Sequence, residues 1–184
     1  YLNINNKNYG NKNITAKDPT HGTHVSGIIA ATRNNNLGMD GVADNVKILS
    51  VRVVPDGDEY DKDIALGVFY AVDNGAKVIN MSFGKEISPE KYWVDSAFKY
   101  AASKDVLIVH AAGNETLNLD VEENFPSTHF LNNEIATNVI TVGASTDPSI
   151  TNEGFVADFS NYGKQEVDVF APGVKIGRAH VWTP

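Results

Sequence analysis

Asp18-Pro-Thr-His-Gly-Thr-His-Val-Ser-Gly-Ile-Ile-Ala-Ala31 places His21 and His24 at the start of an almost wholly small and apolar segment. Its apolar residues recur at the spacing of one helix face, which predicts a buried helix from His21 to about Thr32. A neutral imidazole held in a fixed position can accept a proton from a hydroxyl and later return it to a leaving amine. His21 is therefore a candidate catalytic base. The alternative is a core histidine whose ring bonds to backbone groups.

The spacing of the histidines argues against a metal-dependent hydrolase. Metalloprotease ligands lie at i and i+4 with a glutamate between them, whereas His21 and His24 lie three apart with no acid between them. We therefore interpret His24 as structural. Asp18 precedes Pro19 in the loop before the helix, where we expect it to form a turn or a cap. An acid partner of a catalytic histidine normally comes from a separate strand.

Composition excludes several classes of protein. The chain has 184 residues, 42% of them hydrophobic and 21% charged, which fits one globular domain or part of one. A formal net charge of −8 argues against nucleic acid as a partner, because phosphate binding needs clustered Lys and Arg. The chain has no cysteine, so it has neither disulfides nor thiolate metal sites. No apolar run approaches the roughly 20 residues of a membrane segment.

Strands and helices alternate along the chain. Predicted strands cover Val46–Val54, Ala76–Met81, Asp105–Val109 and Asn138–Gly143, with shorter ones at Phe155–Ser160 and Val167–Phe170. Predicted helices run from Lys62 to Asn74, and from Ser88 as N-cap to about Lys104. In the first helix we expect Asn74-Gly75 to end the helix and five residues to face inward: Ile64, Ala65, Val68, Ala71 and Val72. Residues 113–136 form a long polar loop. This order predicts an α/β fold in which helices flank a parallel sheet in three layers.

Two short segments follow neighbouring predicted strands. Ser82-Phe83-Gly84 could offer backbone groups to an extended peptide, or could simply end its strand in a glycine turn. The small residues of Ala111-Ala112-Gly113 would let a backbone lie close. The Asn114 amide could donate to a developing oxyanion, although a turn asparagine is the alternative. Ligands bind beyond the carboxyl ends of parallel strands, so both segments are candidates for one site.

Taken together and in order, these segments resemble the subtilases, the subtilisin-like serine proteases. His21-Gly-Thr-His-Val-Ser-Gly27 resembles the histidine motif of that family. Five further segments resemble family landmarks: Gly41–Ala43, Val78–Gly84, Ala111–Asn114, Phe159–Gly163 and Phe170–Gly173. The resemblance covers roughly residues 18–176. It implies a subtilisin-like fold and an endopeptidase that cleaves polypeptides with an Asp, His and Ser triad. It also implies a secreted or cell-envelope location.

The resemblance implies a role for each site residue. His21 would be the general base and acid, and Asn114 would donate to the tetrahedral oxyanion. Ser82, Phe83 and Gly84 would pair with the substrate backbone, while Ala111, Ala112 and Gly113 would line the pocket for the residue before the scissile bond. No cofactor would be required. Asn34–Gly38 resembles a family calcium loop, but it is slightly longer than that pattern and lacks the upstream partners, so no metal site is assigned.

The resemblance also sets expectations about the domain boundaries. Residues 1–176 would be part of a subtilisin-like domain that is incomplete at both ends, because its triad aspartate and serine lie outside this chain. The chain alone would then be inactive. Residues 177–184 read like a translated sequencing adapter, and we expect no function for them. A non-catalytic subtilase-like domain that binds peptides or acts as a scaffold is the alternative. A Gly-Thr-Ser segment after Gly173 would distinguish the two.

Overall fold

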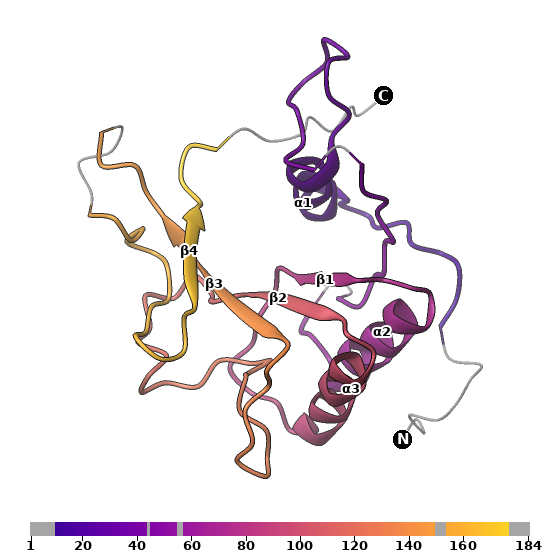
Figure 1. Cartoon of the computed structure of the whole chain (residues 1–184), viewed down its shortest axis with the longest axis vertical. Helices are drawn as coiled ribbons and strands as arrows, with labels where there is room; N and C mark the ends of the chain where they lie inside the picture. The colour runs from indigo at the N-terminus through magenta and orange to yellow at the C-terminus, as the bar shows by residue number, and fades with distance from the viewer. Residues whose placement is uncertain (1–9, 44, 55–56, 150–153, 177–184) are drawn as a thin grey trace. The chain divides into compact units, whose positions relative to one another are not determined.

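The computed structural model describes residues 10–43, 45–54, 57–149 and 154–176 (Figure 1). The prediction for residues 177–184 lies outside the described residues. The described chain forms two compact parts. One comprises residues 51–174, and the other comprises residues 10–50 with residues 175–176. Each part is considered by itself below. No helix among the described residues is long and apolar enough to cross a bilayer.

A four-stranded parallel sheet forms the centre of residues 51–174 (Figure 1). Its strands, in spatial order, are β1 (Val78–Met81), β2 (Leu107–Ala111), β3 (Val139–Ser145) and β4 (Val169–Pro172), and each pairs in parallel with the next. The α/β class with a parallel sheet is therefore confirmed. A Cβ on Gly143 would lie 2.4 Å from Cε1 of Phe170, so the ring covers this part of β3.

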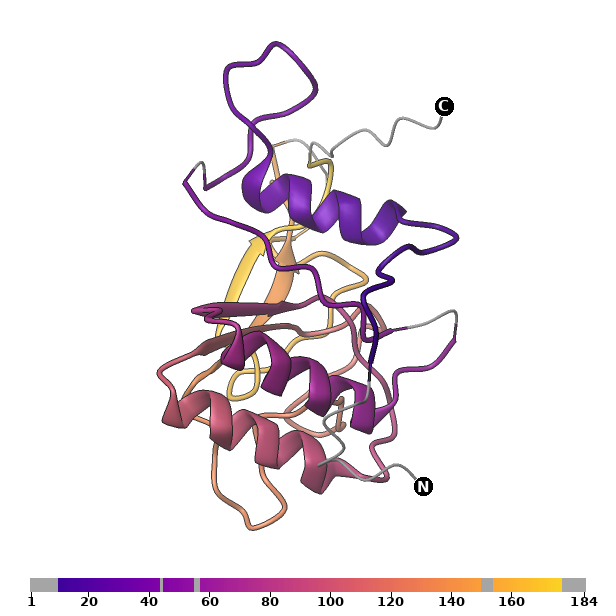
Figure 2. The same cartoon turned by 90° about the vertical axis from the view of Figure 1, so that its right-hand side faces the viewer.

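Helices α2 (Asp61–Asp73) and α3 (Lys91–Ser103) lie side by side beneath β1 and β2 (Figure 2). The residues predicted to face inward on α2 are all buried: Ile64, Ala65, Val68, Ala71 and Val72. Phe98 of α3 and Ile108 of β2 belong to the same core cluster. Burying a side chain of that size stabilises the fold by about 2–3 kcal/mol. Gly75 ends α2 with a φ of +85°, the left-handed conformation that favours glycine.

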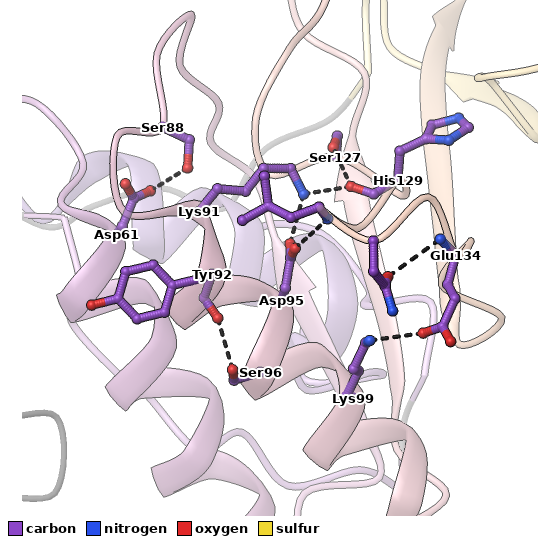
Figure 3. Close-up of polar contacts among 12 residues, drawn as sticks. Asp61, Ser88, Lys91, Tyr92, Asp95, Ser96, Lys99, Ser127, His129 and Glu134 are labelled. Carbon is purple, nitrogen blue, oxygen red and sulfur yellow. Dashed lines mark hydrogen bonds and ion pairs between the residues drawn. The ribbon is translucent and has the colours of Figure 1, made fainter.

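Helix α3 begins at Lys91, so the prediction of Ser88 as its N-cap is wrong. The Ser88 hydroxyl instead donates to Oδ1 of Asp61 over 2.6 Å (Figure 3). The backbone N–H of Glu90 donates to the second oxygen of the same carboxylate over 2.8 Å. Asp61, in the first turn of α2, thus accepts the Glu90 N–H that a Ser88 cap would have accepted.

The loop after β2 is anchored to α3 through a largely buried ion pair (Figure 3). Lys91 bridges Oδ1 of Asp95 at 2.6 Å and also donates to the carbonyl oxygen of His129. The other oxygen of Asp95 accepts the N–H of Leu131 over 2.8 Å. These bonds join segments that are far apart in sequence, so they fix the course of a loop that lacks helices and strands.

Two predicted strands are absent from the described sheet. Residues 46–54 form no strand and span the boundary between the two compact parts. A high strand propensity does not by itself provide a neighbouring strand to pair with. The side chain of Val53 packs on α2 instead, where a Cβ on Gly67 would lie 2.3 Å from it. The predicted strand Phe155–Ser160 is reduced to one isolated bridge between Val156 and Ser145.

In residues 10–50, the chain turns back onto the end of helix α1 (Thr20–Ala30). Val42 and Ala43 donate their N–H groups to the carbonyl oxygens of Ile28 and Ile29, over 2.9 and 2.8 Å. The segment therefore satisfies carbonyl groups that the end of a helix leaves without partners. A Cβ on Gly41 would lie 2.3 Å from the Ala31 nitrogen, so this close approach requires glycine.

The prediction that α1 is buried is wrong for the described structure. No residue of α1 is buried, and His21 is exposed. Apolar periodicity identifies the face that could be covered, but a covering surface must come from other segments. A part of about 40 residues cannot enclose a helix by itself.

Candidate functional site

The two predicted binding segments leave adjacent strands at the same end of the sheet. Met81 of β1 pairs in register with His110 of β2, and both strands run in the same direction. Ser82–Gly84 follows the first strand, and Ala111–Asn114 begins at the last residue of the second. The structure therefore brings these segments together at the carboxyl edge, where parallel sheets bind ligands.

Ser82–Gly84 forms one wall of this candidate site. The hydroxyl of Ser82 accepts a hydrogen bond from Nδ2 of Asn80 over 2.9 Å. Phe83 packs against the apolar core, which directs its side chain away from the edge. Gly84 is exposed, and a Cβ there would lie 3.2 Å from Nδ2 of Asn124. The wall is thus a partly exposed backbone segment anchored through the partly buried ring of Phe83.

Ala111–Asn114 forms the other wall. Ala112 is buried with 1% exposure, whereas Asn114 is exposed. Gly113 has a φ of +110°, and a Cβ there would lie 2.4 Å from Nδ2 of Asn161, so glycine is required on two grounds. The N–H of Asn114 donates to Oε2 of Glu115 over 2.8 Å. The bend at Gly113 leaves the side-chain amide of Asn114 in solvent, where a ligand can reach it.

Asn161 holds this second wall in place, and sequence reasoning assigned it no role. Its Nδ2 donates to the carbonyl oxygen of Ala112 and to Oε2 of Glu115, over 2.9 and 2.8 Å. Its Oδ1 accepts the N–H groups of Glu115 and Leu117. Its own N–H donates to the Gly113 carbonyl oxygen over 3.0 Å. Asn161 is fully buried. It lies in the segment Phe159–Gly163, which the sequence identified only as a landmark.

His110 is a second residue of the site that sequence reasoning missed. It lies on β2 with 4% exposure, and its Nε2 is 3.0 Å from the carbonyl oxygen of Phe83. Burial lowers the pKa of His110 to about 4, although the bond to Phe83 opposes this shift. The ring is therefore neutral near pH 7. A histidine within an otherwise apolar strand was the signal that could have identified it.

A pocket of about 320 Å³ opens beside His110. Its walls come from β2, β3, the loop after β2 and Glu166: His110, Leu119, Asp120, Val121, Glu122, Glu123, Asn124, Pro126, Ser127, Thr128, His129, Thr141 and Glu166. Hydrogen bonds from the N–H groups of Gln165 and Lys164 lower the pKa of Asp120. His129 and Glu166 face each other with 2.8 Å between Nε2 and Oε1. Carboxylates and two imidazoles thus line this pocket together with apolar side chains.

The histidine motif belongs to residues 10–50. Oδ1 of Asp18 accepts the N–H of Thr20 over 2.9 Å, so the prediction that Asp18 forms a turn or cap is confirmed. Hydrogen bonds from Thr20 lower the pKa of Asp18. His21 is exposed in the first turn of α1, and His24 is partly buried. The strand ends belong to the other compact part, so the predicted base and the predicted oxyanion donor come from separate parts of the chain.

The loop Asn34–Gly38 is closed by its own hydrogen bonds. Asn34 has a φ of 58° and Asn36 one of 59°, a left-handed conformation that asparagine tolerates. Oδ1 of Asn35 accepts the N–H of Leu37 over 2.9 Å, and Oδ1 of Asp40 accepts that of Asn34 over 3.2 Å. Across the described residues, no three His, Asp or Glu side chains converge as a metal site would require.

Comparison with known proteins gives one consistent family. Residues 1–183 match the model of the subtilase family, Peptidase_S8. The chain is 41% identical over 157 residues to the thermophilic serine proteinase of Bacillus sp. (strain AK1), covering 85% of this chain and 35% of that protein. It is 41% identical over 168 residues to the cell wall-associated protease of Bacillus subtilis (strain 168), covering 91% of this chain and 17% of that protein.

A solved structure gives the same result. The nisin leader peptidase NisP from Lactococcus lactis aligns with a TM-score of 0.69 and 28% sequence identity. The alignment covers 89% of this chain and 49% of that structure. The chain thus spans half the length or less of these three proteins.

Proposed function

The chain belongs to the subtilase family, and we propose that it provides the general base, the oxyanion donor and part of the substrate cleft of a serine endopeptidase. The observation that carries the proposal is the pairing of β1 with β2, which places Ser82–Gly84 beside Ala111–Asn114 at one edge of the sheet. The names of the related proteinases support the same reaction class.

His21 and Asn114 would perform the two chemical tasks available in this chain. His21 would take the proton of a serine hydroxyl as that oxygen attacks the scissile carbonyl, and would then return a proton to the leaving amine. Its exposure in the first turn of α1 suits a group that must meet substrate. Asn114 would donate from its exposed amide to the oxyanion of the tetrahedral intermediate. Neither the nucleophile nor the triad acid is assigned to a residue of this chain.

The two walls of the site would bind a polypeptide in extended form. The backbone of Ser82–Gly84 would pair with the peptide as an added strand. Ala111, Ala112 and Gly113 would line the pocket for the side chain before the scissile bond, because their small size leaves room for it. The bonds from Asn161 support this role, since they hold the Ala112 and Gly113 carbonyl groups in fixed positions before substrate arrives.

We also propose that the reaction needs no cofactor and that the protein acts outside the cytoplasm. The chemistry assigned to His21 and Asn114 is proton transfer and hydrogen bonding, which side chains supply alone. The location is supported by relatives described as a cell wall-associated protease and an extracellular basic protease.

The test is expression of the complete reading frame, followed by a peptidase assay. Hydrolysis of a polypeptide that is blocked by a serine-directed inhibitor and lost in His21→Ala would support the proposal. Purified, folded full-length protein that binds peptides without cleaving them would instead favour the non-catalytic alternative. The segment after Gly173 provides an independent check, because an enzyme needs Gly-Thr-Ser there.

A further inference from the structure

The side chain of His110 continues the contact between β1 and β2 beyond the last backbone pair of the two strands. The last pair in register is Met81 with His110. Beyond it, Nε2 of His110 lies 3.0 Å from the carbonyl oxygen of Phe83. His110 also immediately precedes Ala111, the first residue of the opposite wall. His110 therefore connects the two walls of the candidate site. It contacts Ser82–Gly84 by a hydrogen bond, and it is joined to Ala111–Asn114 by the peptide bond to Ala111.

The chemistry of this contact fixes the state of the imidazole. Burial keeps the ring neutral near pH 7, because it lowers the pKa of His110 to about 4. A neutral imidazole carries one N–H, and a carbonyl oxygen can only accept. Nε2 must therefore carry the hydrogen and donate it to Phe83. With 4% exposure, the His110 side chain is largely removed from water, which favours keeping this bond.

The far end of the same wall is fixed independently. Lys85 and Phe125 exchange two backbone hydrogen bonds, each of 2.9 Å. The Lys85 ammonium lies 2.6 Å from Oδ1 of Asp61, whose side chain is 2% exposed. Lys85 and Met81 thus hold the two ends of the wall. Between them, the bond from His110 fixes the orientation of the Phe83 carbonyl.

We propose that His110 is a positioning residue that orients the Phe83 carbonyl and so presents the backbone of Ser82 and Gly84 to an extended peptide. In an extended chain, neighbouring residues direct their backbone N–H and C=O groups to opposite edges. If the Phe83 carbonyl faces His110, the backbone groups of Ser82 and Gly84 therefore face the opposite edge, where a peptide can bind. This role rests on the proposed function. The ligand class is a peptide that extends on the amino side of the bond to be cut.

The test compares His110→Ala with His110→Gln and Thr141→Val in the full-length protein. Thr141 pairs in register with His110, is 4% exposed and lines the same pocket, so it is a matched control. We expect His110→Ala to raise KM for a long peptide about tenfold, equivalent to about 1.4 kcal/mol. In this variant kcat should change little. The KM for a peptide truncated on its amino side should also change little. Gln should restore the native KM, because its amide can donate from the position of Nε2.

Two kinetic results would overturn the role of His110. One is an equal change for long and truncated peptides, and the other is the same KM shift in Thr141→Val. Amide hydrogen exchange at Phe83, whose backbone polar groups face inward in this arrangement, tests the positioning without activity, and we expect it to be faster in His110→Ala than in Thr141→Val. A native protein that cleaves nothing would refute the proposed function alone. An active enzyme whose exchange is unchanged by His110→Ala would refute the role of His110 alone.

Discussion

Nδ2 of Asn161 donates to the carbonyl oxygen of Ala112 over 2.9 Å, although 49 positions separate the two residues in the chain. The same side chain reaches Glu115 and Leu117, so one buried amide fixes the segment that bends at Gly113. Asn114 takes its position from this segment. A preorganised donor must be placed before charge develops on the substrate, and Asn161 provides that placement in the folded chain.

Asn161→Asp should destabilise the protein strongly. The second carboxylate oxygen would replace Nδ2 and face two acceptors, the carbonyl of Ala112 and the carboxylate of Glu115. We expect a loss of about 3 kcal/mol in the free energy of unfolding, measured by urea denaturation. Asn13→Asp is the control, since that residue is exposed and its Oδ1 accepts the N–H of Thr15 over 3.0 Å. Equal losses in both variants would contradict the role of Asn161.

His21→Ala should abolish catalysis with little effect on folding. General acid–base catalysis contributes about 10²–10⁴-fold, so we expect kcat to fall by at least about 10²-fold. His24→Ala is the matched control from the same helix, and its kcat should stay close to native. The measurement is steady-state hydrolysis of a peptide by the full-length protein, with circular dichroism to verify folding. A larger loss of kcat in His24→Ala would reverse the assignment.

Asn114→Ala should lower kcat more than it raises KM. In subtilisin itself, removal of the asparagine that donates to the oxyanion lowers kcat by about 10²–10³-fold, and we expect a loss of the same order here. Because Asn114 is exposed, the free energy of unfolding should stay nearly unchanged. The measurement compares kcat and KM for one peptide between native protein and variant. An unchanged kcat would make Asn114 a turn residue.

His110 should make the protein less stable in acid. Its pKa is about 4 in the folded protein, against an ordinary value of 6.5. Between these values the unfolded chain binds a proton that the folded chain excludes, so stability falls as pH drops from 6.5 to 4. The free energy of unfolding lost between pH 6.5 and pH 4 is about 3 kcal/mol, and no such loss occurs above pH 6.5. Denaturation of native protein and His110→Gln at pH 7.5 and pH 4 should show a smaller loss in the variant; parallel losses would contradict this.

Asp61 and Lys85 should show strong coupling in a double-mutant cycle. Their atoms lie 2.6 Å apart, with side chains 2% and 12% exposed. Asp61→Ala leaves a buried ammonium without its counter-ion, which should cost about 3–5 kcal/mol. Adding Lys85→Met should recover part of that loss. The exposed pair Lys99 and Glu134 is the control, and its coupling should be below about 1 kcal/mol. Similar coupling in both cycles would argue against a buried pair.

Local pattern alone determined the helical layer and the strand ends. The inward residues of α2, the glycine after it and the parallel strands could all be predicted, because each depends on periodicity or turn chemistry within a few residues. The two candidate walls, Ser82–Gly84 and Ala111–Asn114, followed from the same reasoning. Strand ends in a parallel sheet gather at one edge whatever the rest of the chain does.

Only the tertiary structure decided how those walls are held. Asn161 bonds to Ala112, His110 to Phe83 and Asp61 to Ser88 across long stretches of sequence. A buried polar group must find a partner, but the sequence does not say which distant group will be brought within 3 Å. For the same reason residues 46–54, strand-like by composition, form no strand in the described chain. Propensity is local, whereas a ladder partner, a cover for α1 and a bond to a buried amide depend on the fold.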